Sequence, residues 1–85
     1  MKMKWFPVRR VMLVFNKETD VLVRRYELSS FKLKEIQRVF NQEPGDLMYY
    51  VYRITENEAP YFRKKYGRRF HFKKYEYCLE CERKK

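Results

Sequence analysis

The stretch that decides the fold is residues 11–28, which read Val-Met-Leu-Val-Phe, then Asn-Lys-Glu-Thr-Asp, then Val-Leu-Val-Arg-Arg-Tyr-Glu-Leu. Two runs rich in β-branched and aromatic residues flank five polar residues, a pattern typical of a β-hairpin. Asn16 and Asp20 suit the loop because their short side chains bind nearby backbone and tolerate left-handed geometry. Alternation predicts that Leu22 shares a face with Tyr26. Since a lone hairpin is marginal in water, other strands and a helix must cover it.

Beyond the hairpin, the apolar period changes from two residues to 3.6 between residues 32 and 41, which predicts a helix. About ten residues form only a marginal helix alone, so its apolar side must pack on the sheet. Ser29 or Ser30 is the expected N-terminal cap. Residues 42–46, Gln-Glu-Pro-Gly-Asp, form the turn that ends the helix. The apolar side consists of Leu33, Ile36, Val39 and Phe40.

Three further elements are expected after this turn. Residues 47–54 predict a third strand, and large side chains on both of its faces favour a central position in the sheet. A short helix follows, capped by Thr55 or Asn57; Pro60 favours Asn57, because proline fits the first turn of a helix. Gly67 ends this helix. Residues 75–82 form the fourth strand.

The order strand-strand-helix-strand-short helix-strand predicts an α+β fold. We expect a single two-layer domain over residues 1–85, in which one main helix packs on a four-stranded antiparallel sheet. One Trp, eight Tyr and seven Phe supply the large apolar area that so small a core requires. Residues 1–7, with Trp5 or Phe6 against the sheet edge, and residues 83–85 are expected to fray.

The charge of the chain is strongly positive, with 21 Lys and Arg against 11 Asp and Glu and a formal net charge of +10. Such a surplus favours nucleic acid, an acidic protein or an anionic membrane surface as partner, although it also serves solubility. No stretch approaches the ~20 apolar residues of a membrane span, and the N-terminus lacks the apolar core of a signal peptide. We therefore expect a cytoplasmic protein that has no membrane partner.

Residues 78–81, Cys-Leu-Glu-Cys, raise the question of a redox pair or half a zinc site. In a strand, residues three apart point to opposite faces, so the two sulfurs diverge. His71 is the only other soft ligand, whereas a structural zinc site needs four ligands. His71 could also act as a general base, but no Ser or Cys nucleophile is expected beside it. Ion pairs explain Glu76, Glu80 and Glu82 on one strand face more simply than acid catalysis does. We expect no enzyme, no catalytic residue, no metal and no cofactor.

The strongest functional signal is residues 61–75, which contain seven basic and six aromatic residues and no acidic one. Basic side chains would neutralise phosphates, and Phe70 or Tyr66 could stack on bases. Alternatively, the rings belong to the core and the charges only solvate a loop. The candidate binding residues are Arg63, Lys64, Tyr66, Arg68, Arg69, Phe70, Lys73 and Lys74.

Several short stretches resemble the cloacin and ribonuclease-colicin immunity proteins. Residues 14–20, Val-Phe-Asn-Lys-Glu-Thr-Asp, are similar to the Trp-Phe-Asp-Lys-Ser-Thr segment near the start of that family. Residues 60–62, Pro-Tyr-Phe, and residues 75–77, Tyr-Glu-Tyr, are similar to its Pro-Tyr-Phe and Asn-Glu-Tyr-Phe segments. The hairpin, residues 47–54 and residues 75–81 also resemble a family of small uncharacterised bacterial domains.

This resemblance implies a four-stranded antiparallel sheet and a non-enzymatic protein that neutralises a partner toxin, a nuclease, by direct binding. Those immunity proteins are acidic because their toxins are basic, whereas this chain is basic. The first expectation is therefore an immunity-like module whose partner is a toxin domain. The alternative is a nucleic-acid- or ribosome-binding protein that uses residues 63–74. A homodimer through an exposed sheet edge or through the aromatic-rich third strand stays open.

Overall fold

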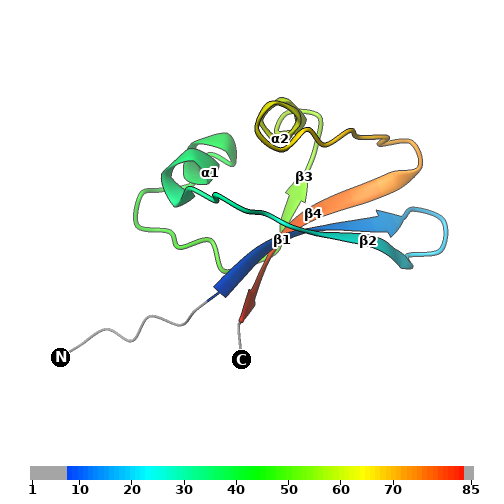
Figure 1. The fold of residues 1–85 in the computed structure, drawn as a ribbon, viewed down its shortest axis with the longest axis horizontal. Coiled ribbons are helices and arrows are strands. Elements are labelled where there is room, and N and C mark those ends of the chain that lie inside the picture. Colours follow the sequence, from blue (N-terminus) through cyan, green and yellow to red (C-terminus); the bar gives the residue numbers. More distant parts are fainter. Residues whose placement is uncertain (1–7, 84–85) are drawn as a thin grey trace.

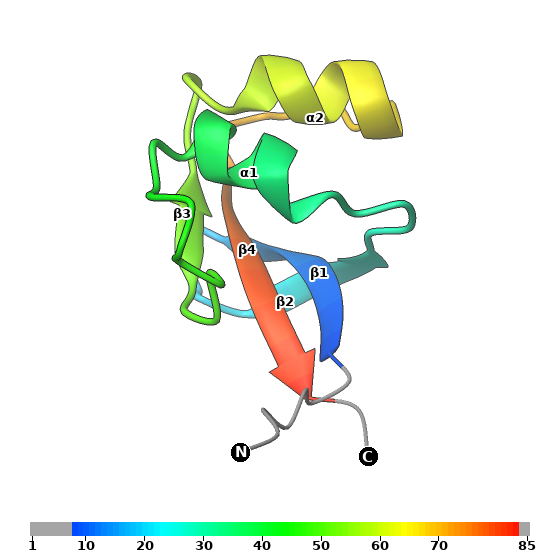
Figure 2. The same ribbon diagram turned by 90° about the vertical axis from the view of Figure 1, so that its left-hand side faces the viewer.

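The elements of the fold follow the predicted order (Figure 1). The computed structural model describes residues 8–83, and its strands form one antiparallel sheet in the order β2-β1-β4-β3. Both helices lie on the same side of the sheet (Figure 2). The predicted α+β fold with a four-stranded antiparallel sheet is therefore confirmed. The elements are β1 (Val8–Asn16), β2 (Leu22–Glu27), α1 (Leu33–Val39), β3 (Tyr52–Ile54), α2 (Ala59–Tyr66) and β4 (Tyr75–Arg83).

The core lies between the sheet and the two helices. Met12 of β1 lies opposite Leu79 of β4 in the ladder, and both are buried. Ile36 of α1 and Phe62 of α2 are fully buried in the same cluster. Because helices of this length are marginal in isolation, the burial of these side chains stabilises them.

The hairpin forms around the predicted polar loop. Asn16 Oδ1 accepts hydrogen bonds from the backbone N–H of Glu18 at 2.8 Å and of Thr19 at 3.2 Å, and Asp20 has the left-handed φ of 58°. These contacts confirm the role expected of Asn16 and Asp20.

A β-bulge in the hairpin was not predicted. Val14 lies opposite Arg24, but the next residue, Phe15, lies opposite Leu22, so Val23 is the extra residue of β2. A bulge moves the residues beyond it to the other face. Leu22 therefore shares a face with Phe15, and the prediction that places it with Tyr26 is wrong.

The helix starts also differ from the predicted caps. The residue before α1 is Lys32, which makes no capping side-chain bond, and Ser30 has a left-handed φ of 55°, so neither serine caps the helix. At α2 the N-cap position is held by Glu58, and Asn57 is not the cap. Thr55, the other predicted cap, lies in the turn before α2: its Oγ1 accepts the Asn57 N–H at 3.2 Å, and its own N–H donates to Glu58 Oε1 at 2.7 Å.

The third strand is shorter than predicted and lies at the edge of the sheet. Residues 47–51 are outside the ladder, and β3 pairs only with β4. Met48 interrupts the extended run with a φ of 54°. Its N–H donates to Asp46 Oδ1 at 2.8 Å, and its carbonyl accepts the Arg10 Nη1 donor at 2.6 Å. These bonds turn the chain toward β1, which a local reading of strand propensity could not reveal.

The ends of the described region bear on two further predictions. Arg83, which the sequence assigns to a frayed tail, is the last residue of β4 and lies opposite Val8. The position of Trp5 or Phe6 against the sheet, with the rest of residues 1–7 and residues 84–85, lies outside the described residues. Within residues 8–83, neither helix has the length and apolar character required to traverse a bilayer.

Candidate binding groove

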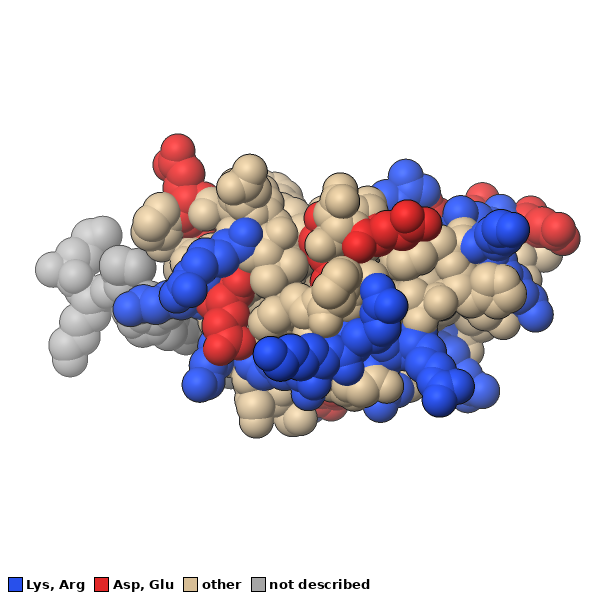
Figure 3. All heavy atoms as spheres, turned by 90° about the horizontal axis from the view of Figure 1, so that it is seen from above, with Lys and Arg blue, Asp and Glu red and all other residues tan. Residues whose placement is uncertain are grey.

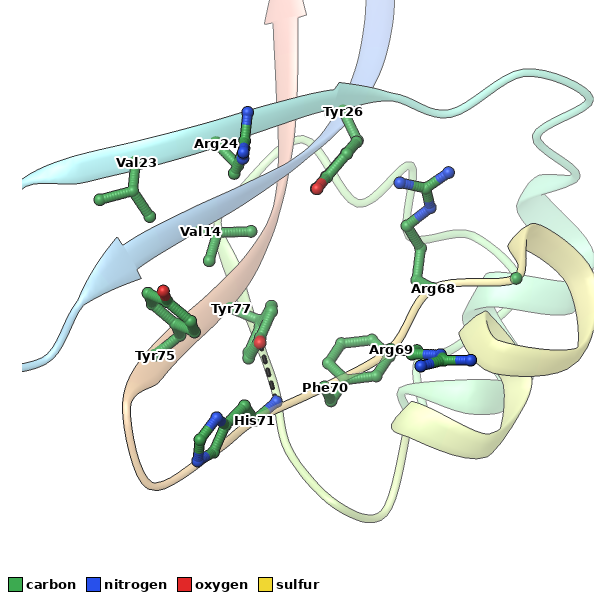
Figure 4. A pocket seen from close by; sticks show the side chains of 11 residues that line it. Val14, Val23, Arg24, Tyr26, Arg68, Arg69, Phe70, His71, Tyr75 and Tyr77 are labelled. Carbon is green, nitrogen blue, oxygen red and sulfur yellow. Dashed lines mark hydrogen bonds between the residues drawn. The ribbon is translucent and has the colours of Figure 1, made fainter.

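A groove of about 770 Å³ lies between β2 and the segment that joins α2 to β4 (Figure 4). The hairpin end of β1 and β2 projects beyond the helices in Figure 1, and residues 67–75 run beside it. Strand and segment therefore form the two walls. The lining residues are Val14, Val23, Arg24, Tyr26, Gly67, Arg68, Arg69, Phe70, His71, Tyr75 and Tyr77.

The course of the segment wall begins with the end of α2. Gly67 has a φ of 66°, a left-handed conformation that glycine adopts without a Cβ clash, and its N–H donates to Arg63 O at 3.0 Å. This cap directs residues 68–71 back along the sheet. The carbonyl of His71 then accepts the Tyr75 N–H at 2.9 Å, in the turn that leads into β4.

Side chains from β4 hold the segment wall in place. The Tyr77 hydroxyl accepts the backbone N–H of His71 at 2.8 Å, the bond drawn in Figure 4. The Phe70 ring meets the edge of Tyr77 at a centroid distance of 4.6 Å and stacks on Phe72 at 5.3 Å. The floor of the groove is therefore a packed cluster of rings, which leaves Phe70 little free surface.

The strand wall contains Arg24 and Tyr26, which alternate onto the helix side of β2, and Val23 at the bulge. Arg24 lies opposite Val14, and Val23, the extra residue, also reaches the groove. Figure 4 shows Tyr26 pointing from β2 toward the segment, while Arg68 reaches in the opposite direction. The Arg68 guanidinium lies 4.3 Å from the Tyr26 ring centroid, a cation–π contact that links the two walls.

The groove is positively charged. No acidic residue is among its lining residues, and within residues 8–83 no carboxylate forms an ion pair with Arg24, Arg68 or Arg69. On the helix side of the molecule, Lys and Arg side chains form a band across the lower part of the view (Figure 3). The arginines of the groove therefore keep their capacity to bind an anion.

The opposite, open face of the sheet has a different charge arrangement. Arg25 of β2 pairs with Glu82 of β4, and because β1 lies between these strands the pair crosses over β1. The guanidinium of Arg25 holds the pKa of Glu82 below its usual value through this hydrogen bond. Two further pairs on this face are Arg9 with Glu27, at 3.7 Å, and Arg53 with Glu76. Glu76 and Glu82 thus form the ion pairs expected from the sequence, whereas Glu80 forms none within residues 8–83.

Three of the eight candidate residues line the groove: Arg68, Arg69 and Phe70. Arg63 and Lys64 are exposed on α2 and do not line it. The positions of these two residues follow from the helical period, which turns their side chains away from the segment that starts at Gly67.

The other three candidates lie elsewhere. Lys73 and Lys74 precede β4 and line a separate hollow beside the hairpin loop. Tyr66 is half-buried and stacks on Phe62 at 6.1 Å, and its hydroxyl makes no hydrogen bond to residues 8–83. Burial raises the pKa of this phenol. The ring packs against the core through Phe62 and does not line the groove.

Lys65 in the same basic segment is used for packing the helices together. Its ammonium lies 2.9 Å from Glu35 Oε1 of α1, and the Tyr61 hydroxyl donates to the same oxygen at 2.7 Å. The bond to Lys65 lowers the pKa of Glu35. Burial, and then the hydrogen bond to Glu35, raises the pKa of Tyr61 to about 12. This network joins α1 to α2 and takes one cation of the segment out of the binding surface.

Sequence reasoning missed the strand wall of the groove. Arg24 and Tyr26 lie more than 40 positions before Arg68, and only the sheet brings them together. The one available signal was the pair Arg24 and Arg25 in adjacent positions of a β strand, since alternation directs one of them to each face. His71, Tyr75 and Tyr77 also line the groove, and none of them is among the candidate residues predicted from the sequence.

The two cysteines lie on opposite faces of β4, as the strand period predicts. Cys78 lies opposite Leu13 of β1, and Cys81 lies opposite Arg10. Both thiols are free, and burial raises the pKa of each. Within residues 8–83 no group of three or more His, Cys, Asp or Glu could hold a metal ion.

The groove, by contrast, offers cationic donors and an apolar floor, which suit the binding of an anionic group.

No curated protein and no solved structure matches this chain. A family model described as a domain of unknown function, DUF7683, matches residues 9–80, a span that includes every residue of the groove. The resemblance to small uncharacterised bacterial domains is compatible with this match. No match links the chain to the cloacin and colicin immunity proteins, and that resemblance stays a prediction. The chain belongs to the DUF7683 family of domains of unknown function.

Proposed function

We propose that this protein is a non-catalytic, immunity-like binding protein whose groove receives an acidic segment of a partner protein, a toxin domain. The observation that supports the proposal is the set of three groove arginines without carboxylate partners in residues 8–83. A guanidinium presents a planar fork of donors that matches a carboxylate. An incoming Asp or Glu side chain would therefore complete ion pairs that the chain itself leaves open.

The apolar parts of the groove suit a protein partner as well. Val14 and Tyr77 are buried at its floor, and Val23 is exposed at its rim beside the exposed Leu22. Tyr and Arg are enriched among the residues that contribute most to protein interfaces, particularly where they surround a pocket. An acidic segment that also carries an apolar side chain would use both the arginines and the floor.

The packing of the rings favours a protein segment over stacked bases. Phe70 contacts Phe72 and Tyr77, and Tyr66 stacks on Phe62. Single-stranded nucleic acids bind strongly where exposed rings accept successive bases. Since these rings contact one another, the groove has few free platforms for stacking.

The proposed mechanism is occlusion of the partner. A small rigid domain that covers a functional surface of a toxin blocks access of its substrate without any chemistry of its own. The acidic immunity proteins neutralise basic toxins, so here the sign of the contact would be reversed. We therefore expect the partner to present carboxylates where it meets Arg24, Arg68 and Arg69.

A second candidate function is nucleic-acid or ribosome binding. The net charge of +10 and the band of Lys and Arg side chains in Figure 3 favour it. Contacts to phosphates would require neither the ring faces nor the groove floor, because they depend on charge alone. This alternative predicts binding spread over Arg63, Lys64, Lys73 and Lys74 as well as over the groove.

The experiment compares two variants that lose the same charge. The groove variant carries Arg24→Gln, Arg68→Gln and Arg69→Gln, and the open-face variant carries Arg9→Gln, Arg25→Gln and Arg53→Gln. Each is measured by fluorescence anisotropy with two probes, a labelled peptide of alternating Glu and Leu and a labelled single-stranded oligo-uridine. Circular dichroism checks that both variants are folded.

We expect the groove variant to lose peptide affinity about tenfold or more, because three ion pairs are lost, while the open-face variant retains it. Equal losses in both variants would contradict a role of the groove. Oligo-uridine binding that exceeds peptide binding, decreases steeply with salt and weakens equally in both variants would instead support the second candidate.

A further inference from the structure

The edge of the sheet formed by β3 is exposed and apolar. Tyr50 and Val51, which lead into β3, are 78% and 60% exposed, and Tyr49 before them is also exposed. Monomeric proteins rarely leave three consecutive large apolar residues in water, unless the residues serve an interaction. On the outer side of β3, no backbone hydrogen bond joins residues 50–54 to another described segment.

The sequence of this edge is that of a strand with neighbours on both sides. Residues 49–54 read Tyr-Tyr-Val-Tyr-Arg-Ile, and five of these six residues are strong strand formers. The pattern predicts a central strand, yet β3 spans only Tyr52–Ile54 and lies at the edge. A strand from outside the chain would give β3 the second neighbour that its sequence fits.

The other edge of the sheet, at β2, also exposes three consecutive apolar residues, Val21, Leu22 and Val23, but charges and a bulge interrupt it. β2 carries Arg24 and Arg25, and the bulge at Val23 interrupts its ladder. Charged side chains and bulges are the devices that keep edge strands from pairing with other molecules. Along β3 only Arg53 is charged, and it is engaged with Glu76 on the open face.

The charges around β3 also differ from those of the whole chain. Residues 43–58 contain four carboxylates and a single basic residue, whereas the chain has a net charge of +10. In a symmetric pair of chains, the carboxylates near the two β3 strands face each other, and the excess positive charge of each copy lies away from the contact. Like-charge repulsion between two copies is therefore weaker for an approach through this edge than for an approach through the groove.

We propose that a second copy of this chain pairs with β3 through its own β3, antiparallel, to form one continuous sheet. Such a contact is the same on both copies and closes on itself, so it yields a dimer and no filament. With a two-fold axis perpendicular to the sheet, the helices of both copies stay on one face. The groove borders β2 at the far edge and remains accessible, so this inference is independent of the proposed partner binding.

The test is the mass of the chain in solution, measured by sedimentation equilibrium over a range of concentrations. The contact is small, so we expect a dissociation constant on the order of 100 µM. Val51→Lys places a charge on the β3 edge, and Val21→Lys, at a residue of similar exposure (57%), is the matched control beside β2. Tyr50→Lys is a second edge variant, should Val51→Lys fail to fold.

We expect the wild-type chain to approach twice its 10.8 kDa mass at high concentration, and the edge variants to weaken the dimer about tenfold or more. Val21→Lys adds the same charge and should leave the dimer intact. Added salt should strengthen dimerisation, because it screens repulsion between the two basic chains. A wild-type chain that stays monomeric at about 1 mM would overturn the proposal. Equal weakening by Val21→Lys and Val51→Lys would also overturn it.

Discussion

The two faces of the sheet differ in whether their arginines have carboxylate partners. On the open face, charged side chains of β2 and β4 pair with each other across β1, as Arg25 and Glu82 do. On the helix side, the groove arginines face rings and aliphatic side chains and have no carboxylate partner among the described residues. The arginines of the open face are therefore neutralised within the chain, whereas those of the groove can still bind an anionic ligand.

A positive net charge provides a binding site only where the fold keeps basic side chains away from carboxylates. Arg9, Arg25 and Arg53 each lie within reach of a glutamate on a neighbouring strand, and the resulting ion pairs neutralise their charge. Only cations that the fold separates from carboxylates remain for a partner, and Arg24, which lies opposite Val14 on the helix side of the sheet, is among them. Charge counted along the sequence cannot make this distinction, because it depends on which residues are neighbours in space.

The largest effect on the free energy of unfolding should come from replacing one leucine on each face by alanine. Leu79 is 1% exposed below the helices, and Leu13 is 8% exposed on the open face. We expect Leu79→Ala to cost about 4 kcal/mol of unfolding free energy, because the packed core cannot collapse around the cavity. Leu13→Ala should cost about 2 kcal/mol, since flexible charged side chains beside it can relax. Urea denaturation measures both, and equal losses would contradict the contrast between the faces.

A smaller effect should follow from loosening the segment wall of the groove. Tyr77→Phe removes the acceptor for the His71 N–H and should cost about 1 kcal/mol. Hydrogen exchange at the His71 amide should become faster in the same variant. Tyr75→Phe is the control, because the Tyr75 hydroxyl makes no hydrogen bond to the described residues and only its ring contacts Tyr77. If both variants behave alike, the Tyr77 hydroxyl does not hold the wall.

The smallest effect concerns the ion pairs of the open face and their dependence on pH. The pKa of Glu82 is lowered in the folded chain by Arg25, so this pair stabilises the fold above the unfolded pKa of about 4.5. Its contribution is lost as the pH decreases through the folded value. Glu82→Gln should therefore lower the urea midpoint slightly at neutral pH and leave it unchanged in acid.

High salt should reduce the difference between the wild-type chain and Glu82→Gln, because the pair is exposed to solvent. Glu80→Gln is the control on the same face, since Glu80 has no ion-pair partner within residues 8–83. A larger effect of Glu80→Gln than of Glu82→Gln at neutral pH would show that the pairing across β1 does not stabilise the sheet.

Local patterns in the sequence predicted most of the elements. The alternating runs around Asn16 predict β1 and β2, and the 3.6-residue period predicts α1 with Ile36 toward the core. Gly67 marks the end of α2 for the same kind of reason, because only its own backbone geometry is involved. The wrong cap predictions, Ser29 or Ser30 and Asn57, concern choices between nearby residues, whereas the wrong position of the third strand concerns contacts with distant segments.

The candidate groove was predicted only in part. Arg68, Arg69 and Phe70 belong to one basic and aromatic segment, and the sequence showed them together. Arg24 and Tyr26 reach the same groove from β2, and no local pattern pairs them with that segment. The aromatic content of the segment predicted ring surfaces for a ligand, but the tertiary structure uses most of these rings to hold the segment against β4.

The α+β class and the hairpin follow from patterns among residues that are near in the chain, and the excess of positive charge follows from the composition alone. Only the tertiary structure decided the strand order, the exposed edge at β3 and the division between paired and unpaired arginines. The pair Arg25 and Glu82 joins residues 57 positions apart. Contacts at that separation arise from the packing of the whole sheet. The same packing forms the groove and the exposed β3 edge, on which the proposed functions depend.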